Sequence, residues 1–213
     1  KKSDDFAELL ATVARDTYSS GYRVIFNWKN PPTITITQAP QTVAVTQTIV
    51  NEAFPLLTYV FFQENSASIP NRYRLLSEDD TATFDYKALP PDAMVYYYNM
   101  LNIIGRRMKA TPQATITITG CNANTDNEQN NLALSQQRAE AVAAYLRRVW
   151  DIAPERMIVE SRNLPVAPSR NTDEAARSEN RRVEINSDTW DIIKPVVFKS
   201  TTYERADTDT ASV

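Results

Sequence analysis

Arg138 is the residue whose type and position most clearly suggest binding chemistry. It lies in the stretch Asn131–Leu146, whose apolar residues recur at helical spacing. The polar loop Cys121–Asp126 comes shortly before this stretch and follows an alternating strand, Ala114–Thr119. A guanidinium binds a carboxylate through two parallel hydrogen bonds, whereas an amine needs a carbonyl or carboxylate acceptor. We therefore expect Arg138 and the loop to flank one shallow pocket at the C-terminal edge of the strand.

The residue counts exclude several kinds of catalytic and metal site. The 213 residues include no histidine, a single cysteine (Cys121) and three glycines. A Ser-His-Asp triad, an imidazole or thiolate zinc site and an intrachain disulfide are therefore excluded, as are a Walker loop and a dinucleotide fingerprint. No motif pairs two carboxylates across a scissile bond. We expect a protein that is not an enzyme and that uses no cofactor and no metal.

Charge and hydropathy exclude two further classes of partner. The net charge is −3 and the basic residues are scattered, whereas a protein that follows a nucleic-acid backbone needs a basic stripe. No run of about 18 apolar residues occurs, so we expect no membrane-spanning helix in this chain. Hydrophobic residues make up 42% of the sequence, which is enough to form a core. Because the chain starts at Lys1 without methionine or a signal core, we interpret it as processed or partial.

Residues 1–53 are expected to form a β-rich lead-in segment. A short helix over Asp4–Tyr18 is followed by strands at Tyr22–Trp28, Thr33–Thr37 and Gln41–Thr46. These strands have apolar faces but too few partners to bury them alone. We therefore expect residues 1–46 to depend on neighbouring sequence or on another chain.

Residues 54–186 are expected to form a second unit, followed by an extension or linker over 187–213. Its elements alternate between strand and helix, and Asp92 is a candidate N-cap for the first helix. This order predicts an α+β fold, a βαβαββ mixed sheet with helices packed on it. The expected elements are Leu56–Phe62, Asp92–Lys109, Ala114–Thr119, Glu128–Trp150, Met157–Glu160 and Arg182–Ile185.

Four motifs occur in order within this unit. Residues Asn131–Leu146 fit the pattern N-x-x-L-S-x-x-R-A-x-x-V-x-x-Y-L, and Arg177–Glu184 fit R-x-x-N-R-R-V-E. Val60–Ile69, with Asn65, is a strand and turn, and Ile152–Arg156 precedes the third strand. Together these motifs resemble the OmpA-like peptidoglycan-binding family, which includes the C-terminal domain of outer-membrane protein A, the peptidoglycan-associated lipoprotein and flagellar stator proteins.

The resemblance implies a non-enzymatic domain that anchors a larger assembly to peptidoglycan. The location implied is the periplasm or the outer membrane of a Gram-negative-type bacterium, with other envelope or assembly proteins as further partners. In the family, the arginine of the helix binds the carboxylate of diaminopimelate in the stem peptide, and an aspartate in a G-x-T-D loop binds its ammonium. Arg138 occupies the arginine position, and Arg182 and Asn180 occupy positions that support the pocket.

The position of the family's aspartate is occupied by Ala123, eight residues before Asn131. Asp126, or the amides of Asn122 and Asn124, could replace the missing acceptor for the amine. Loss of an ionised partner costs a charge-assisted hydrogen bond, about 1.5–3 kcal/mol. The alternative interpretation is therefore a scaffold domain that kept the fold, lost peptidoglycan binding and serves protein–protein contacts.

Each candidate also has a structural interpretation. Arg138 could pair with a nearby glutamate or bind a loop carbonyl instead of a ligand. Asn131 and Asn65 could line the pocket, but asparagines at helix starts and turns are usually backbone caps. Because side chains alternate along a strand, Arg181 and Arg182 are expected on opposite faces.

Overall fold

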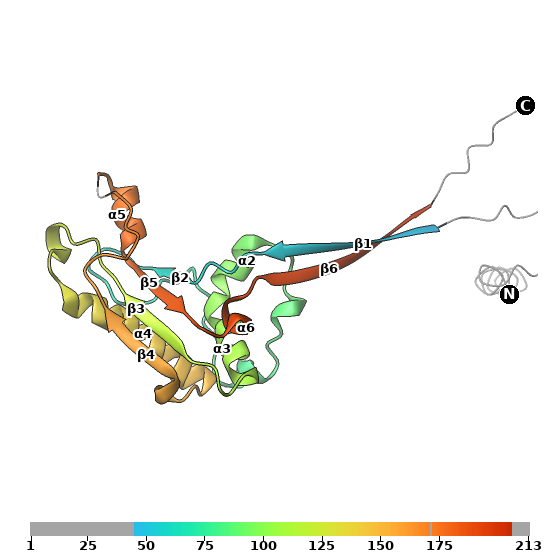
Figure 1. Cartoon of the computed structure of the whole chain (residues 1–213), viewed down its shortest axis with the longest axis horizontal. Helices are drawn as coiled ribbons and strands as arrows, with labels where there is room; N and C mark the ends of the chain where they lie inside the picture. The colour runs from blue at the N-terminus through green and yellow to red at the C-terminus, as the bar shows by residue number, and fades with distance from the viewer. Residues whose placement is uncertain (1–44, 171, 206–213) are drawn as a thin grey trace, which may run out of the picture. The chain divides into compact units, whose positions relative to one another are not determined.

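The computed structural model describes residues 45–170 and 172–205, so the expected helix, the first two expected strands and residues 41–44 of the third lie outside the described part. Contacts gather residues 46–204 into one unit. It contains a four-stranded sheet in the order β2-β5-β3-β4 and a separate two-stranded ladder of β1 and β6 (Figure 1). The strands are β1 (Val45–Phe54), β2 (Tyr59–Phe61), β3 (Ile116–Gly120), β4 (Met157–Ser161), β5 (Arg182–Asn186) and β6 (Val196–Arg205).

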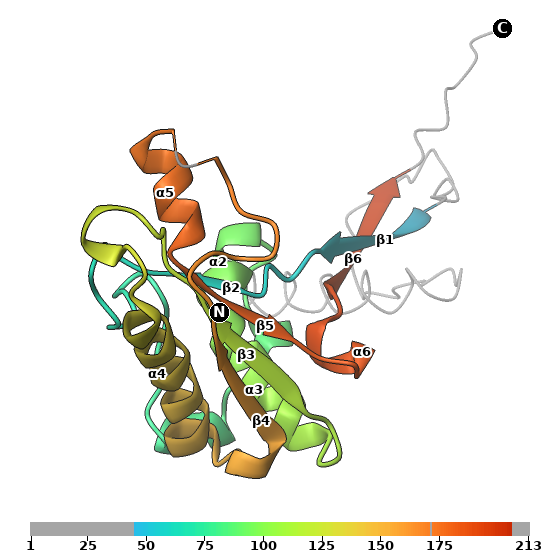
Figure 2. The same ribbon diagram turned by 60° about the vertical axis from the view of Figure 1, so that its left-hand side comes forward.

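The four-stranded sheet is mixed, as the sequence predicts. Strand β3 pairs in parallel with β4 and antiparallel with β5, while β2 pairs antiparallel with β5. The parallel crossover from β3 to β4 runs through helix α4 (Leu132–Trp150), which packs against both strands (Figure 2). The loop between β3 and α4 therefore lies at the C-terminal edge of β3. The other α-helices are α2 (Ala93–Tyr98), α3 (Met100–Ala110), α5 (Glu174–Asn180) and α6 (Trp190–Ile193).

Two helix boundaries differ from the expected ones. Asp92 caps α2 as predicted, since its side chain accepts from two backbone N–H groups of the first turn. The helix then breaks at Asn99, whose backbone departs from helical values with φ of −96° and ψ of 7°, although its N–H still donates to the Val95 carbonyl at 3.1 Å. Helix α4 begins at Leu132, four residues later than expected, because the 3-10 turn η3 (Asp126–Glu128) precedes it.

The core lies between the sheet and the helices α3 and α4. The inward side chains Val60, Ile118 and Ile185 have no exposed surface. Asn102 is also fully buried, and it is satisfied because its side-chain oxygen accepts from Tyr145 Oη at 2.5 Å and Trp150 Nε1 at 3.3 Å. The core thus includes a closed polar network that joins α3 to α4.

Residues after β5 also take part in the packing. Ile192 of α6 and Val196 of β6 are buried, and Arg107 of α3 donates to the carbonyls of Ile192 and Lys194 at 3.0 and 2.6 Å. Residues 187–205, part of the expected extension, therefore supply a helix and a strand. Among the described residues, none of the helices is long and apolar enough to cross a bilayer.

Gly105→Ala is expected to destabilise the protein, against the usual trend for helices. Alanine in a helix interior is normally favoured over glycine by about 1 kcal/mol. A Cβ at Gly105 would lie 2.5 Å from Cδ1 of the buried Trp150 ring, so α3 or the ring must move. We expect a net loss of about 1–3 kcal/mol in the free energy of unfolding, measured by urea denaturation. Arg106→Ala, on the exposed side of α3, is the control, and a stabilised Gly105→Ala would contradict the packing argument.

Candidate functional site

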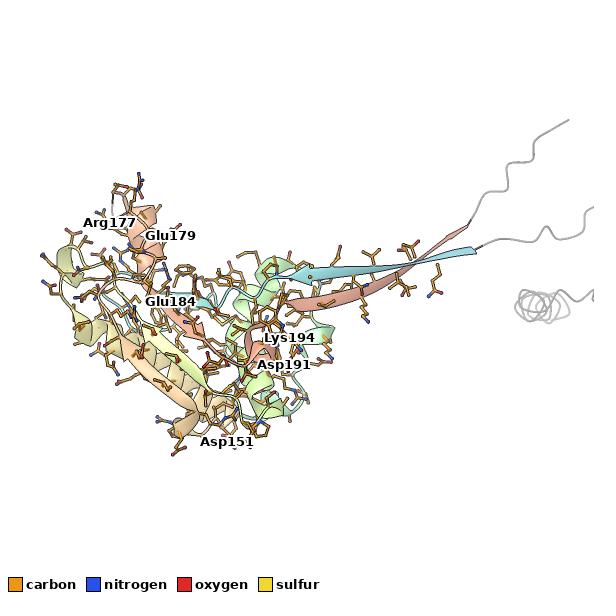
Figure 3. All side chains as sticks on the ribbon, viewed as in Figure 1. Asp151, Arg177, Glu179, Glu184, Asp191 and Lys194 are labelled. Carbon is orange, nitrogen blue, oxygen red and sulfur yellow. The ribbon has the colours of Figure 1, made fainter. Side chains whose placement is uncertain are left out.

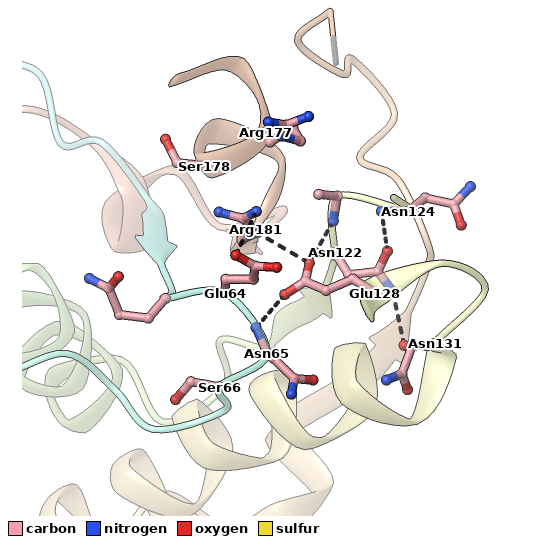
Figure 4. A network of polar contacts seen from close by, with 12 residues as sticks. Glu64, Asn65, Ser66, Asn122, Asn124, Glu128, Asn131, Arg177, Ser178 and Arg181 are labelled. Atoms are coloured by element: carbon pink, nitrogen blue, oxygen red, sulfur yellow. Dashed lines mark hydrogen bonds and ion pairs between the residues drawn. The ribbon is translucent and has the colours of Figure 1, made fainter. Parts of the chain in front are cut away.

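Three segments meet beside the N-terminal end of α4. They are the turn after β2, the loop between β3 and α4, and the junction of α5 with β5 (Figure 4). Asn122 fixes the loop to the helix, because its buried side-chain amide donates to the Asn131 carbonyl at 2.9 Å and to Ser135 Oγ at 3.0 Å. Its side-chain oxygen accepts from the Asn124 N–H at 2.7 Å. Asn122 therefore holds the loop in shape.

Arg138 lies at the centre of this region and has no exposed surface. Its Nε donates to the Ser66 carbonyl at 2.8 Å. Nη1 donates to the Cys121 carbonyl at 3.0 Å and Nη2 to the Gln63 carbonyl at 3.0 Å. The two remaining N–H groups face Glu128, at 2.5 Å to Oε1 and 3.4 Å to Oε2. All five donors of the guanidinium thus have acceptors within the chain, as in the structural interpretation of this residue.

Glu128 is the residue of the site that the sequence did not single out. Its carboxylate accepts from Arg138 and also from the backbone N–H groups of Asn65 at 2.8 Å and Ala123 at 2.9 Å. Only 1% of the residue is exposed. The acid that the loop lacks at position 123 is therefore supplied from five residues further along. The available signal was a carboxylate in the expected helix start, three residues before Asn131.

The surroundings of Glu128 keep it ionised. Burial alone would raise the pKa of the Glu128 carboxyl, but the hydrogen bonds from Arg138 and from the N–H groups of Ala123 and Asn65 outweigh burial and lower it. The pair with Arg138 is therefore a buried salt bridge between two full charges.

Arg181 connects this buried pair to the surface. Its Nε lies 3.6 Å from Glu128 Oε2, and Nη1 lies 2.5 Å from Glu174 on α5. Nη2 lies 3.8 Å from Glu64, whose side chain is 46% exposed (Figure 4). Arg177 of α5 (Figure 3) is half-buried and also pairs with Glu174. The surface above the pair thus carries two exposed carboxylates, Glu64 and Glu174, beside the half-buried Arg177.

The other loop candidates lie close by in different roles. Asn131 is the N-cap of α4, since its side-chain oxygen accepts from the Leu134 N–H at 3.0 Å. Asn65 has a left-handed backbone, with φ of 50°, and contributes its N–H to Glu128. Asp126 is exposed at the start of η3, so the acid that reaches Arg138 is Glu128. Ala123 is fully buried beneath that carboxylate.

Two supporting candidates lie outside the Glu128 cluster. Arg182 donates to Glu184 at 2.9 Å and lies over the Tyr59 ring, whereas Arg181 precedes β5 and contacts other partners. Asn180 is buried and exchanges two hydrogen bonds with the backbone of Ser169. It therefore holds the segment that leads into α5.

The loop offers neither a reactive thiol nor a metal site within the described residues. Burial raises the pKa of Cys121 to about 12, so this thiol stays protonated at neutral pH. Over residues 45–170 and 172–205, no three histidine, cysteine, aspartate or glutamate side chains gather as metal ligands.

Comparison with known proteins shows which proteins part of this chain resembles. Residues 96–181 match the sequence model of the OmpA family. The chain is 36% identical over 88 residues to the peptidoglycan-binding protein ArfA of Mycobacterium tuberculosis, a match that covers 41% of this chain and 27% of ArfA. The chain thus spans about a quarter of the length of the curated relatives it matches.

Two solved structures are among those to which this chain is similar. One is the peptidoglycan-associated lipoprotein from Burkholderia pseudomallei, with a TM-score of 0.43, 24% identity, and coverage of 61% of this chain and 89% of that one. Another is the C-terminal domain of Helicobacter pylori MotB, with a TM-score of 0.40, 22% identity, and coverage of 62% and 84%. Residues 96–181 are thus similar to the OmpA family model, and they lie within an α+β fold.

Proposed function

We propose that this chain is a non-enzymatic protein of the cell envelope whose OmpA-like domain binds peptidoglycan and anchors a larger assembly to it. The observation that supports this most directly is the set of donors around Glu128. The guanidinium of Arg138 and the N–H groups of Asn65 and Ala123 converge on one carboxylate. A periplasmic or outer-membrane-associated location follows from this proposal, because peptidoglycan lies there.

The ligand we propose is the diaminopimelate of the stem peptide. Its carboxylate would bind the donors of Arg138, Asn65 and Ala123, which together match the geometry of an anion. Its ammonium would meet the exposed Asp126 of the same loop, and Asn131 would line the edge. In the structure Glu128 occupies the carboxylate position, so a ligand has to replace it there.

One observation favours a second candidate function. All five donors of Arg138 already have acceptors within the chain, and the residue is fully buried. A domain whose binding groups all satisfy one another serves equally well as a scaffold for protein–protein contacts, without binding the cell wall.

Pelleting with two kinds of purified peptidoglycan tests the proposal. Lysine-type stem peptides lack one carboxylate that diaminopimelate-type peptides carry and keep the amine. We expect weak pelleting with the diaminopimelate type, displaced by free diaminopimelate, and an affinity at least about tenfold lower for the lysine type, since a charge-assisted hydrogen bond is lost. Equal pelleting with both would mean that another surface holds the wall. Absence of pelleting with both would leave the scaffold as the function.

A further inference from the structure

The carboxylate of Glu128 is held by donors from three segments of the chain, one of which is the start of its own loop. The donors are the Asn65 N–H after β2, the Ala123 N–H after β3 and the guanidinium of Arg138 on α4. We call these three groups the carboxylate-binding position. Two amide N–H groups and a guanidinium suit any small carboxylate. Glu128 supplies only the anion. The three donors that make up the carboxylate-binding position belong to other residues.

The segment that carries Glu128 is the least regular part of the site. Glu128 ends the three-residue turn η3, and Asn124, Asp126 and Asn130 around it have left-handed backbones, with φ of 51°, 49° and 55°. Such conformations are unfavourable for residues with a side chain, although asparagine and aspartate tolerate them best. Arg138, in contrast, lies in the second turn of a 19-residue helix. Movement of the η3 loop would therefore withdraw Glu128 while leaving the donors in place.

We propose that Glu128 is an internal ligand of the carboxylate-binding position and that an external carboxylate binds there only by displacing it. This inference rests on the proposed function, in which the external carboxylate is that of diaminopimelate in the stem peptide. A carboxylate tethered by a short loop competes at an effective concentration of roughly millimolar. The apparent affinity for peptidoglycan is then the intrinsic affinity multiplied by the fraction of molecules in which Glu128 has left the carboxylate-binding position.

Chemical rescue of a Glu128 variant tests the inference. Glu128→Ala removes the internal carboxylate and leaves Arg138 buried without its counter-ion. We expect a lowered Tm that sodium acetate raises with the logarithm of its concentration above its Kd, by roughly 5–10 °C at a hundredfold excess. Sodium chloride at equal ionic strength should not do so. If the variant is unfolded in chloride, near-UV circular dichroism after refolding in acetate replaces the melting curve.

Matched variants identify where acetate acts. Glu128→Gln fills the carboxylate-binding position with an uncharged side chain of the same shape. Its Tm should therefore be the same in acetate as in chloride. The double variant Glu128→Ala/Arg138→Met lacks the guanidinium and should also show no rescue. If acetate and chloride act alike on Glu128→Ala, or if it stays unfolded in both, the inference is overturned.

Peptidoglycan binding separates this inference from the proposed function. Glu128→Ala should pellet with diaminopimelate-type peptidoglycan at an affinity at least about tenfold above that of the wild type, since the internal competitor is gone. Rescue by acetate without any pelleting would uphold the carboxylate-binding position and reject the proposed function. Pelleting of the wild type without rescue of Glu128→Ala would uphold the proposed function and reject the internal ligand.

Discussion

Arg138→Met is expected to lower the free energy of unfolding by about 3–5 kcal/mol, the cost of removing one partner from a buried ion pair. Methionine fills a similar length but donates no hydrogen bond. Glu128 would then remain buried without the guanidinium that contributes most to lowering its pKa. The carbonyls of Gln63, Ser66 and Cys121 would also lose their donor. Urea denaturation followed by circular dichroism measures the loss.

Two further variants show whether the ion pair is the cause. Arg148→Met makes the same change at an exposed position of α4 and should stay within about 0.5 kcal/mol of the wild type. Adding Glu128→Gln to Arg138→Met removes the unpaired charge, so the double variant should recover part of the loss, with a coupling of about 0.5–3 kcal/mol. Equal costs for Arg138→Met and Arg148→Met would mean that the buried pair contributes nothing to stability.

The fold follows from local patterns that the sequence displays directly. The alternating Thr-Ile-Thr-Ile stretch predicts β3, and the strand observed is Ile116–Gly120. The helical spacing in 131–146 predicts α4, which runs over Leu132–Trp150. Both patterns reflect one buried face, a property of neighbouring residues. Local breaks were harder to foresee. The expected helix over 92–109 divides at Asn99, where a single residue leaves helical φ and ψ, and the apolar spacing carries no sign of it.

Glu128 could not be identified from spacing, for two physical reasons. A glutamate at the expected start of a helix already has an ordinary role, since it interacts favourably with the helix dipole. One of its partners, Asn65, lies 63 residues away and meets it only once the sheet has formed. The resemblance predicts an aspartate at position 123, where the chain has alanine, and Asp126 is the acidic residue nearest to that position in the sequence. Burial, which only the structure gives, distinguishes the exposed Asp126 from the buried Glu128.

Gly120→Ala is the second large effect expected, because this residue sets the distance between β3 and α4. A Cβ there would lie 2.8 Å from the carbonyl carbon of Ser135 and closer still to its oxygen. Both atoms belong to the backbone of α4, so no side-chain rotation relieves the contact. We expect a loss of about 3 kcal/mol or more in the free energy of unfolding, at the upper end of the cost of overpacking a core. Urea denaturation measures it.

The choice of variants separates a backbone contact from a side-chain contact. Ser161→Ala changes the residue opposite Gly120 on β4 and should cost less than about 1 kcal/mol. The added Cβ at 120 would also lie 3.2 Å from the Cβ of Ala139. Ala139→Gly removes that neighbour. If Gly120→Ala/Ala139→Gly regained the wild-type free energy of unfolding, the contact with the Ala139 side chain would be the cause of the loss. We expect no recovery, because the Ser135 backbone remains. Since α4 also carries Arg138, a displaced helix should loosen the Glu128 pair as well, and acetate should then fail to rescue Glu128→Ala in a Gly120→Ala background.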